Sequence, residues 1–223
     1  MQLNRLYNMD CMDGMKPFPD KYFDLAIVDP PYGCEVNNDR IERTGGTWSK
    51  KYGKRIKQWD IAPSCEYFDE LFRVSKNQII WGGNYFRLPP TRCFLIWRKL
   101  TISESFSMAM CEYAWTSLTR NAKLFEYAPQ DKNRFHPTQK PVALYRWLLS
   151  HYAKKGDIIL DTHAGSAASL VAAWEAGLSY VGFEVDSDYF SKAQARLDTV
   201  QEQGRLLFDS EPLIADVQKG IFS

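Results

Sequence analysis

The strongest chemical signal in the sequence is the run Asp29-Pro30-Pro31-Tyr32, which directly follows a short apolar stretch at 23–28. Such a stretch is typical of a buried strand, and ligands of open α/β sheets bind at the carboxyl ends of strands. The two prolines lack N–H donors, so the local backbone offers only carbonyl acceptors beside the Asp29 carboxylate. The run therefore suits an amino group, with Tyr32 stacking on the planar ring that bears it. A plain turn that ends a strand is the alternative.

A second candidate site is the turn from Asp161 to Ser166, which follows another short apolar run. Glu184 ends the next expected strand, roughly 20 residues later, where an acidic residue can bind ribose hydroxyls. A glycine turn that leads into a helix binds the anionic end of a ligand, so this layout favours a nucleoside cofactor. It is not the GxGxxG of a nicotinamide site, because only Gly165 is present. Asp161 would repel a pyrophosphate and suits a ligand with an ammonium group.

The elements that must position these turns alternate along the chain. Strands are expected at 23–28, 78–81, 157–160 and 180–185, with an antiparallel pair at 93–97 and 111–117. Helical patterns lie at 64–75, 140–153, 166–176 and 187–203, the last two stopped by Gly177 and Gly204. We therefore expect an α/β fold in one domain, 1–223, with a doubly wound, mostly parallel, Rossmann-like sheet and an antiparallel strand at one edge.

Charge is segregated although the whole chain has a net charge of only +1. The segment 37–58 carries two acidic residues and seven basic ones: Arg40, Arg43, Lys50, Lys51, Lys54, Arg55 and Lys57. Glycines and aromatic residues lie among them. This composition indicates a basic loop that faces a polyanion, and a merely solvated loop is the alternative.

Other classes of protein are disfavoured by composition. No run approaches the ~20 apolar residues of a membrane span, and the first residues lack the apolar run of a signal peptide. The five cysteines are odd in number and form no CxxC pair. We therefore expect a cytoplasmic protein with no membrane contact, no disulfide frame and no metal site.

Together the two turns resemble those of DNA amino-methyltransferases, which act on N6 of adenine or N4 of cytosine. The order of the motifs, with Asp29-Pro30-Pro31-Tyr32 first and the glycine turn last, is similar to that of the permuted β group. Phe135-His136-Pro137-Thr138-Gln139-Lys140-Pro141 matches one of that group's most specific signatures, and the resemblance covers nearly the whole chain.

The resemblance implies S-adenosylmethionine as cofactor, double-stranded DNA as substrate and adenine N6 as methyl acceptor. Catalysis would fall to Asp29, Pro30, Pro31 and Tyr32, with Asp29 and the Pro30 carbonyl accepting from the amino group of a flipped-out base. The cofactor-binding residues would be Asp10, Cys11, Asp29, His136, Thr138, Lys140, Asp161, His163, Ala164, Gly165, Ser166 and Glu184. Target recognition is expected from the 37–58 loop, which would contact DNA, and from a minor segment at 98–134. A homodimer is left open.

The cofactor turn departs from the family pattern, because DTHAGSAAS stands where DPFxGSGTT is usual. Ala167 in place of glycine is compatible with the turn if its φ is helical. Three rival functions remain open: N4-cytosine methylation, methylation of an RNA or protein amide, and a DNA-binding remnant with impaired cofactor binding.

The basic loop generates a test of its own. Each neutralised phosphate contributes about −0.9 to the slope of log K against log salt on duplex DNA. Changing Lys50, Lys51, Lys54 and Arg55 together to alanine is expected to flatten that slope by about 2 to 4 units. An unchanged slope in DNA-binding titrations would mean that the loop is only solvated.

Overall fold

The computed structural model describes residues 1–33, 60–105, 108–129 and 131–208, apart from the side chains of 205–208. Its centre is an eight-stranded sheet with the order β1-β8-β7-β2-β3-β5-β4-β6. The strands are β1 (Arg5–Asn8), β2 (Phe23–Val28), β3 (Ser75–Trp81), β4 (Phe94–Lys99), β5 (Cys111–Thr116), β6 (Lys123–Tyr127), β7 (Ile158–Asp161) and β8 (Ser179–Glu184). Neighbouring strands pair in parallel except where β5 lies between β3 and β4, antiparallel to both. The expected mostly parallel α/β sheet and its antiparallel pair are confirmed, but the antiparallel strand β5 does not lie at the edge, because β4 and β6 continue the sheet beyond it.

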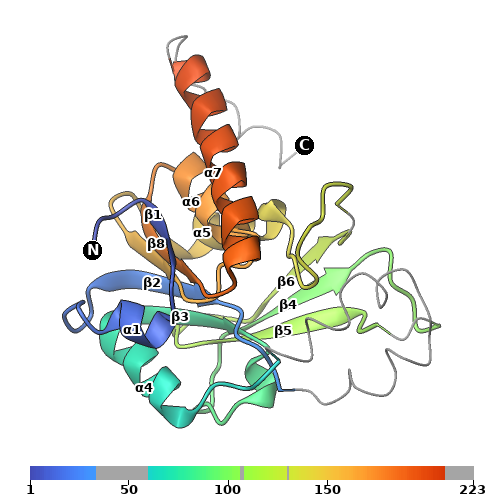
Figure 1. Cartoon of the computed structure of the whole chain (residues 1–223). Coiled ribbons are helices and arrows are strands. Elements are labelled where there is room, and N and C mark those ends of the chain that lie inside the picture. Colours follow the sequence, from blue (N-terminus) through green and yellow to red (C-terminus); the bar gives the residue numbers. More distant parts are fainter. Residues whose placement is uncertain (34–59, 106–107, 130, 209–223) are drawn as a thin grey trace.

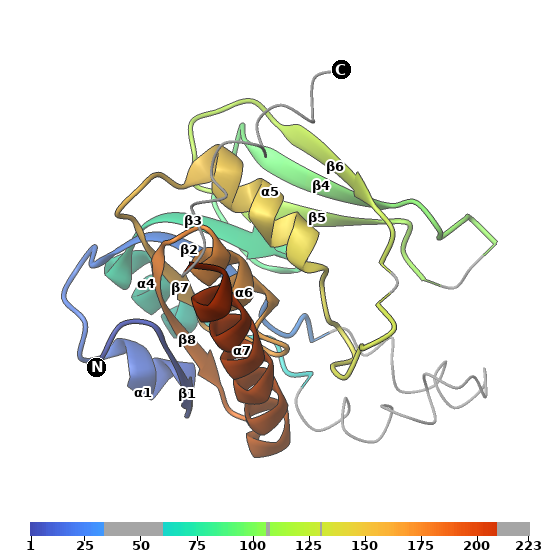
Figure 2. The same ribbon diagram turned by 90° about the horizontal axis from the view of Figure 1, so that it is seen from above.

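Helices cover both faces of this sheet (Figure 1). They are α1 (Cys11–Met15), α4 (Cys65–Val74), α5 (Val142–Tyr152), α6 (Ala168–Glu175) and α7 (Ser187–Phe208), with a short 3-10 turn, η1 (Gly83–Tyr85). Helices α1 and α4 lie on one face, and α5, α6 and α7 lie on the other (Figures 1 and 2). The molecule is therefore a three-layer sandwich.

Side chains alternate between the two faces of the central strands, because successive residues of a strand point to opposite sides. On β2, Leu25 and Ile27 belong to the apolar cluster on the α5–α6 side, whereas Ala26 and Val28 belong to the cluster on the α1–α4 side. All four are at most 1% exposed. Burial on both faces explains why this strand reads as a continuous apolar run.

The site is positioned by the point where the chain order of the strands reverses. From β7 the chain proceeds through α6 to β8, and from β2 through α4 to β3, so the two connections leave in opposite directions across the sheet. The carboxyl ends of β7 and β2 consequently open a crevice between them. Asp29 and Asp161 both stand at this edge.

Helix boundaries differ from the predictions by one or more residues, and two of the differences have a clear cause. Helix α7 continues past Gly204, which was expected to stop it. Gly204 is buried, and a Cβ there would lie 1.8 Å from the indole of Trp174, so the glycine serves close helix packing. Helix α6 begins at Ala168, two residues later than predicted, because the preceding turn contains two residues with positive φ.

The second of those residues, Ala167, contradicts the expected helical φ. Its φ of 56° and ψ of 26° are left-handed, a conformation that costs an L-residue roughly 1–2 kcal/mol and costs glycine little. Ala167 is fully buried at the N-terminus of α6, where its N–H donates to the Ala164 carbonyl at 2.7 Å. The turn thus keeps the shape of a glycine turn with an alanine in it.

Replacing Ala167 by glycine is therefore expected to stabilise the protein. We expect the free energy of unfolding to rise by about 0.5–1 kcal/mol, since glycine's extra freedom in the unfolded chain offsets part of the relieved strain. That corresponds to roughly 1–4 °C in the melting temperature. Ala172→Gly, in the interior of the same helix, is the matched control and should lose about 1 kcal/mol. A less stable Ala167→Gly protein in urea unfolding would rule out the strain.

Candidate active site

A pocket of about 720 Å³ opens along the carboxyl ends of β1, β8, β7 and β2. The predicted catalytic residues all line it, namely Asp29, Pro30, Pro31 and Tyr32. Of the predicted cofactor-binding residues, the lining includes Asp10, Cys11, Asp29, His136, Thr138, Lys140, His163, Ala164, Gly165, Ser166 and Glu184. The structure therefore brings together two turns that lie more than a hundred residues apart in the sequence.

Asp161 is the predicted residue that does not line this pocket. Its carboxylate accepts a hydrogen bond from the Ser169 hydroxyl and another, at 3.0 Å, from the His163 N–H. Burial raises the pKa of Asp161 to about 7. Asp161 therefore stabilises the turn from the protein interior, through its hydrogen bonds to His163 and Ser169.

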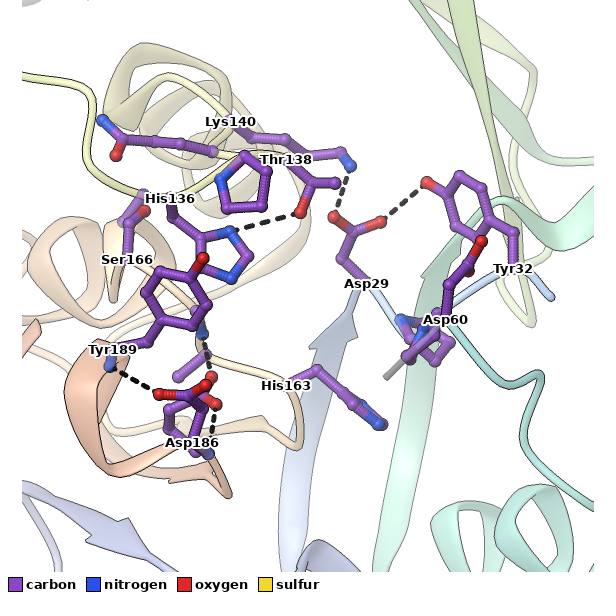
Figure 3. A pocket seen from close by; sticks show the side chains of 18 of the residues that line it. Asp29, Tyr32, Asp60, His136, Thr138, Lys140, His163, Ser166, Asp186 and Tyr189 are labelled. Carbon is purple, nitrogen blue, oxygen red and sulfur yellow. Dashed lines mark hydrogen bonds and ion pairs between the residues drawn. The ribbon is translucent and has the colours of Figure 1, made fainter. Parts of the chain in front are cut away.

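The glycine turn lies against the His136 ring at Gly165. With φ at +52°, Gly165 faces the His136 ring, which would lie 3.2 Å from an added Cβ. The His136 ring also packs edge-on against Tyr189, with the ring centroids 4.4 Å apart (Figure 3). Burial lowers the pKa of His136 to about 4, so the imidazole is neutral at pH 7. The HPTQKP segment thus covers the turn with an uncharged surface.

Glu184 joins the turn to the next strand. One carboxylate oxygen accepts the Gly165 N–H at 2.8 Å and the other accepts the Asp186 N–H at 2.9 Å. The side chain keeps lone pairs for hydroxyl donors in the pocket, because each carboxylate oxygen can accept more than one hydrogen bond. Burial raises the pKa of Glu184 to about 7, although both backbone donors lower it.

Asp29 is held by two donors at the opposite end of the pocket (Figure 3). The Tyr32 hydroxyl donates to Oδ1 at 2.7 Å, and the Lys140 ammonium donates to Oδ2 at 2.5 Å. Burial raises the pKa of Asp29, and the positive charge of Lys140 opposes that shift. Lys140 was predicted to bind cofactor, and in the structure its charged end contacts the Asp29 carboxylate.

Two residues that sequence reasoning missed complete this end of the pocket. Glu112 on β5 lies with Oε2 2.9 Å from Lys140 Nζ, and Lys99 on β4 lies with Nζ 2.6 Å from the other Glu112 oxygen. Although burial alone would raise it, Lys140 and Lys99 hold the pKa of Glu112 at about 2. Their only signal in the sequence is a charged residue within each apolar strand pattern.

The Tyr32 ring has one face covered by protein. It stacks on Tyr85 with the centroids 4.9 Å apart and the planes 19° from parallel. Gly82 permits this position, because a Cβ at Gly82 would lie 2.1 Å from the Tyr32 ring. Burial raises the pKa of Tyr32 well above its usual value, which keeps the hydroxyl a donor to Asp29.

His163 stands where the related pattern has phenylalanine. Its Nδ1 lies 2.9 Å from the Thr162 hydroxyl, and burial lowers its pKa to about 4. Burial also raises the pKa of Cys11 to about 12, which rules out a thiolate there at neutral pH. Among the described residues, no group of three or more His, Cys, Asp or Glu side chains could hold a metal ion.

The predicted DNA contacts cannot be placed in this structure. Arg40, Arg43, Lys50, Lys51, Lys54, Arg55 and Lys57 lie outside the described residues. In the described part of the 98–134 segment, Arg98 pairs with Glu126 at 2.8 Å. No helix within the described ranges is both long and apolar enough to cross a membrane.

Comparisons with known proteins agree with this arrangement. Residues 96–195 match the model of a family described as DNA methylase (N6_N4_Mtase). "Putative methylase YubD" of Escherichia coli (strain K12) is 27% identical over 220 residues, which covers 89% of this chain and 92% of the relative.

Two solved structures share the fold. The M1.HpyAVI–SAM complex superposes with a TM-score of 0.59 and 17% identity, over 87% of this chain and 98% of that one. The PvuII DNA methyltransferase, specific for cytosine N4, also superposes with a TM-score of 0.59. Its identity is 13%, over 92% of this chain and 93% of that one. In the segment 96–195 and in its fold, the chain is therefore similar to N6/N4 DNA methylases.

Proposed function

We propose that this protein transfers a methyl group from S-adenosylmethionine to the exocyclic N6 of an adenine flipped out of double-stranded DNA. The observation that carries the proposal is the Asp29 carboxylate, fixed by Tyr32 and Lys140 in the same pocket as the glycine turn and Glu184. A carboxylate acceptor beside a nucleoside site is what transfer to an amino group requires.

The pocket residues fit the cofactor. Glu184 keeps free lone pairs for the two ribose hydroxyls, and Asp10 and Cys11 line the pocket beside it for the adenine. Gly165 lacks a Cβ where one would press on His136, so the turn can approach a ligand closely. The Thr138 and Ser166 hydroxyls would serve the amino-acid end. When bound, the cofactor supplies an electrophilic methyl group on sulfur.

Asp29 and the Pro30 carbonyl would accept the two hydrogens of the target amino group. The nitrogen lone pair, normally delocalised into the ring, is then directed at the methyl group, which is catalysis by positioning. The new N–C bond forms as the methyl–sulfur bond breaks, the bonding pair stays with sulfur, and the extra proton on nitrogen passes to Asp29 or water. The Tyr32 face that Tyr85 does not cover would stack on the extruded base.

The choice of adenine rests on the residue type at position 29. Cytosine N4 presents the same amino group, and the fold is shared with a cytosine-N4 enzyme. Related cytosine enzymes usually begin this motif with serine, and aspartate favours adenine. Mass spectrometry of nucleosides from DNA incubated with protein and S-adenosylmethionine should show N6-methyladenine. N4-methylcytosine would replace the adenine assignment, and neither product would indicate the DNA-binding remnant.

Asp29→Ala should abolish most of the transfer. Loss of the oriented acceptor is expected to slow single-turnover methylation by about 100- to 1000-fold. Calorimetric affinity for S-adenosylmethionine should stay within about threefold, because Glu184 and the glycine turn are untouched. Asp20→Ala, which removes an exposed carboxylate paired with Arg73, is the control. More than a tenth of the wild-type rate would remove Asp29 from catalysis.

Glu184 generates a pH dependence of cofactor binding. Burial raises the pKa of Glu184 to about 7, so this side chain is largely protonated at pH 6 and largely ionised at pH 8. The ionised form is the one that would accept from both ribose hydroxyls. Affinity for S-adenosylmethionine should therefore fall about tenfold between pH 8 and pH 6. Glu184→Gln should weaken binding at pH 8 and flatten this dependence. Equal pH profiles for the two proteins would place the nucleoside elsewhere.

A further inference from the structure

Glu112 stands one step behind the proposed catalytic carboxylate. Lys140 Nζ lies 2.5 Å from Asp29 Oδ2 and 2.9 Å from Glu112 Oε2, so one ammonium is shared by two carboxylates. The Lys140 side chain is 3% exposed, and its ammonium also lies 5.3 Å from the centre of the Trp81 ring. Little water can take the place of either carboxylate.

The shared ammonium has an electrostatic consequence for the proposed reaction. The target nitrogen becomes cationic as it takes the methyl group, and a lysine in contact with Asp29 opposes that charge. The four charged groups Asp29, Lys140, Glu112 and Lys99 sum to zero, whereas the same cluster without Glu112 sums to +1. In a largely dry site, a surplus positive charge opposes a developing cation far more than it would in water.

Glu112 also competes with Asp29 for the Lys140 ammonium. Without it, Asp29 would be the sole carboxylate in contact with Lys140 among the described residues, and the ammonium would neutralise Asp29 more fully. We infer that Glu112 is a positioning residue of the methyl transfer, which shares Lys140 with Asp29 and supplies the second negative charge that the cationic amino group needs. This inference rests on the proposed function.

A simpler role for Glu112 would be to neutralise Lys99. The Lys99 side chain is 9% exposed and its Nζ lies 2.6 Å from Glu112 Oε1, so Lys99 needs a counter-ion. In the structural role Glu112 acts on Lys99, and in the positioning role it acts on Lys140. A purely structural Glu112 becomes dispensable once Lys99 is gone, whereas a Glu112 that acts through Lys140 does not.

The first measurement is single-turnover methylation at saturating cofactor and DNA. Glu112→Gln is expected to be slower by about 30-fold, with affinity for S-adenosylmethionine within about threefold of wild type. Glu112→Asp, which keeps the charge, should be faster than Glu112→Gln. Glu175→Gln removes a carboxylate from the surface ion pair with Arg146 and is the matched control.

The double variant Glu112→Gln, Lys99→Met separates the two roles. It removes both members of one ion pair, so it should fold even if Glu112→Gln alone does not. Our inference predicts that the double variant stays about tenfold slower than wild type, because Lys140 then pairs with Asp29 alone. Recovery to the wild-type rate would assign Glu112 to Lys99 and overturn the inference. If wild-type protein methylates no DNA, the proposed function fails instead.

The pH profile supplies a readout that a structural role would not move. The charge of Glu112 raises the pKa of Asp29, so removing that charge should shift the acid limb of the rate to lower pH. Among described residues, the titratable groups that interact with Asp29 are Lys140, Glu112, Tyr32, Tyr67, Tyr145 and Asp161. An acid limb unchanged in Glu112→Gln would contradict the inference.

Discussion

The contact between the Lys140 ammonium and the Asp29 carboxylate is the interaction on which the rest of the site depends. It joins the end of β2 to the HPTQKP segment, 111 residues later in the chain, within a nearly dry environment. Removing one partner of a buried pair leaves an uncompensated charge that typically costs about 3–5 kcal/mol. The pair therefore ties the HPTQKP segment to the end of β2, and Lys140 keeps Glu112 as a counter-ion when Asp29 is replaced.

The same contact explains why the pocket is built from so many strands. Asp29 follows β2, Glu112 lies on β5 and Lys99 lies on β4, so the charged end of the pocket needs the antiparallel strand beside β3. The proposed cofactor end needs β7, β8 and β1, whose carboxyl ends carry the glycine turn, Glu184 and Asp10. The reversal of chain order between β7 and β2 brings these two halves side by side.

The sequence predicts the parts of this site that have a local signature. Asp29 to Tyr32 and Gly165 follow buried strands, and an apolar run that ends in such a turn locates a site without knowledge of strand order. Glu112 and Lys99 have no such signature, because their importance comes from strand pairing between β4 and β5. The same limit applies to β6, whose residues are largely exposed at the edge of the sheet and show little apolar pattern.

Backbone detail was also beyond the sequence. Gly204 reads as a helix stop, and only the packing of Trp174 shows why a glycine is needed inside α7. Ala167 reads as compatible with a helical φ, yet the turn imposes a left-handed one. In both cases a tertiary constraint outweighs the local preference of the residue.

The most direct test of the account is a crystal structure of the protein with S-adenosylhomocysteine and duplex DNA that contains its target base. The account predicts an extruded adenine with N6 within about 3 Å of Asp29, stacked on Tyr32, while Lys140 still bridges Asp29 and Glu112. A base whose amino group lies away from Asp29, or a Lys140 that no longer touches Glu112, would contradict it.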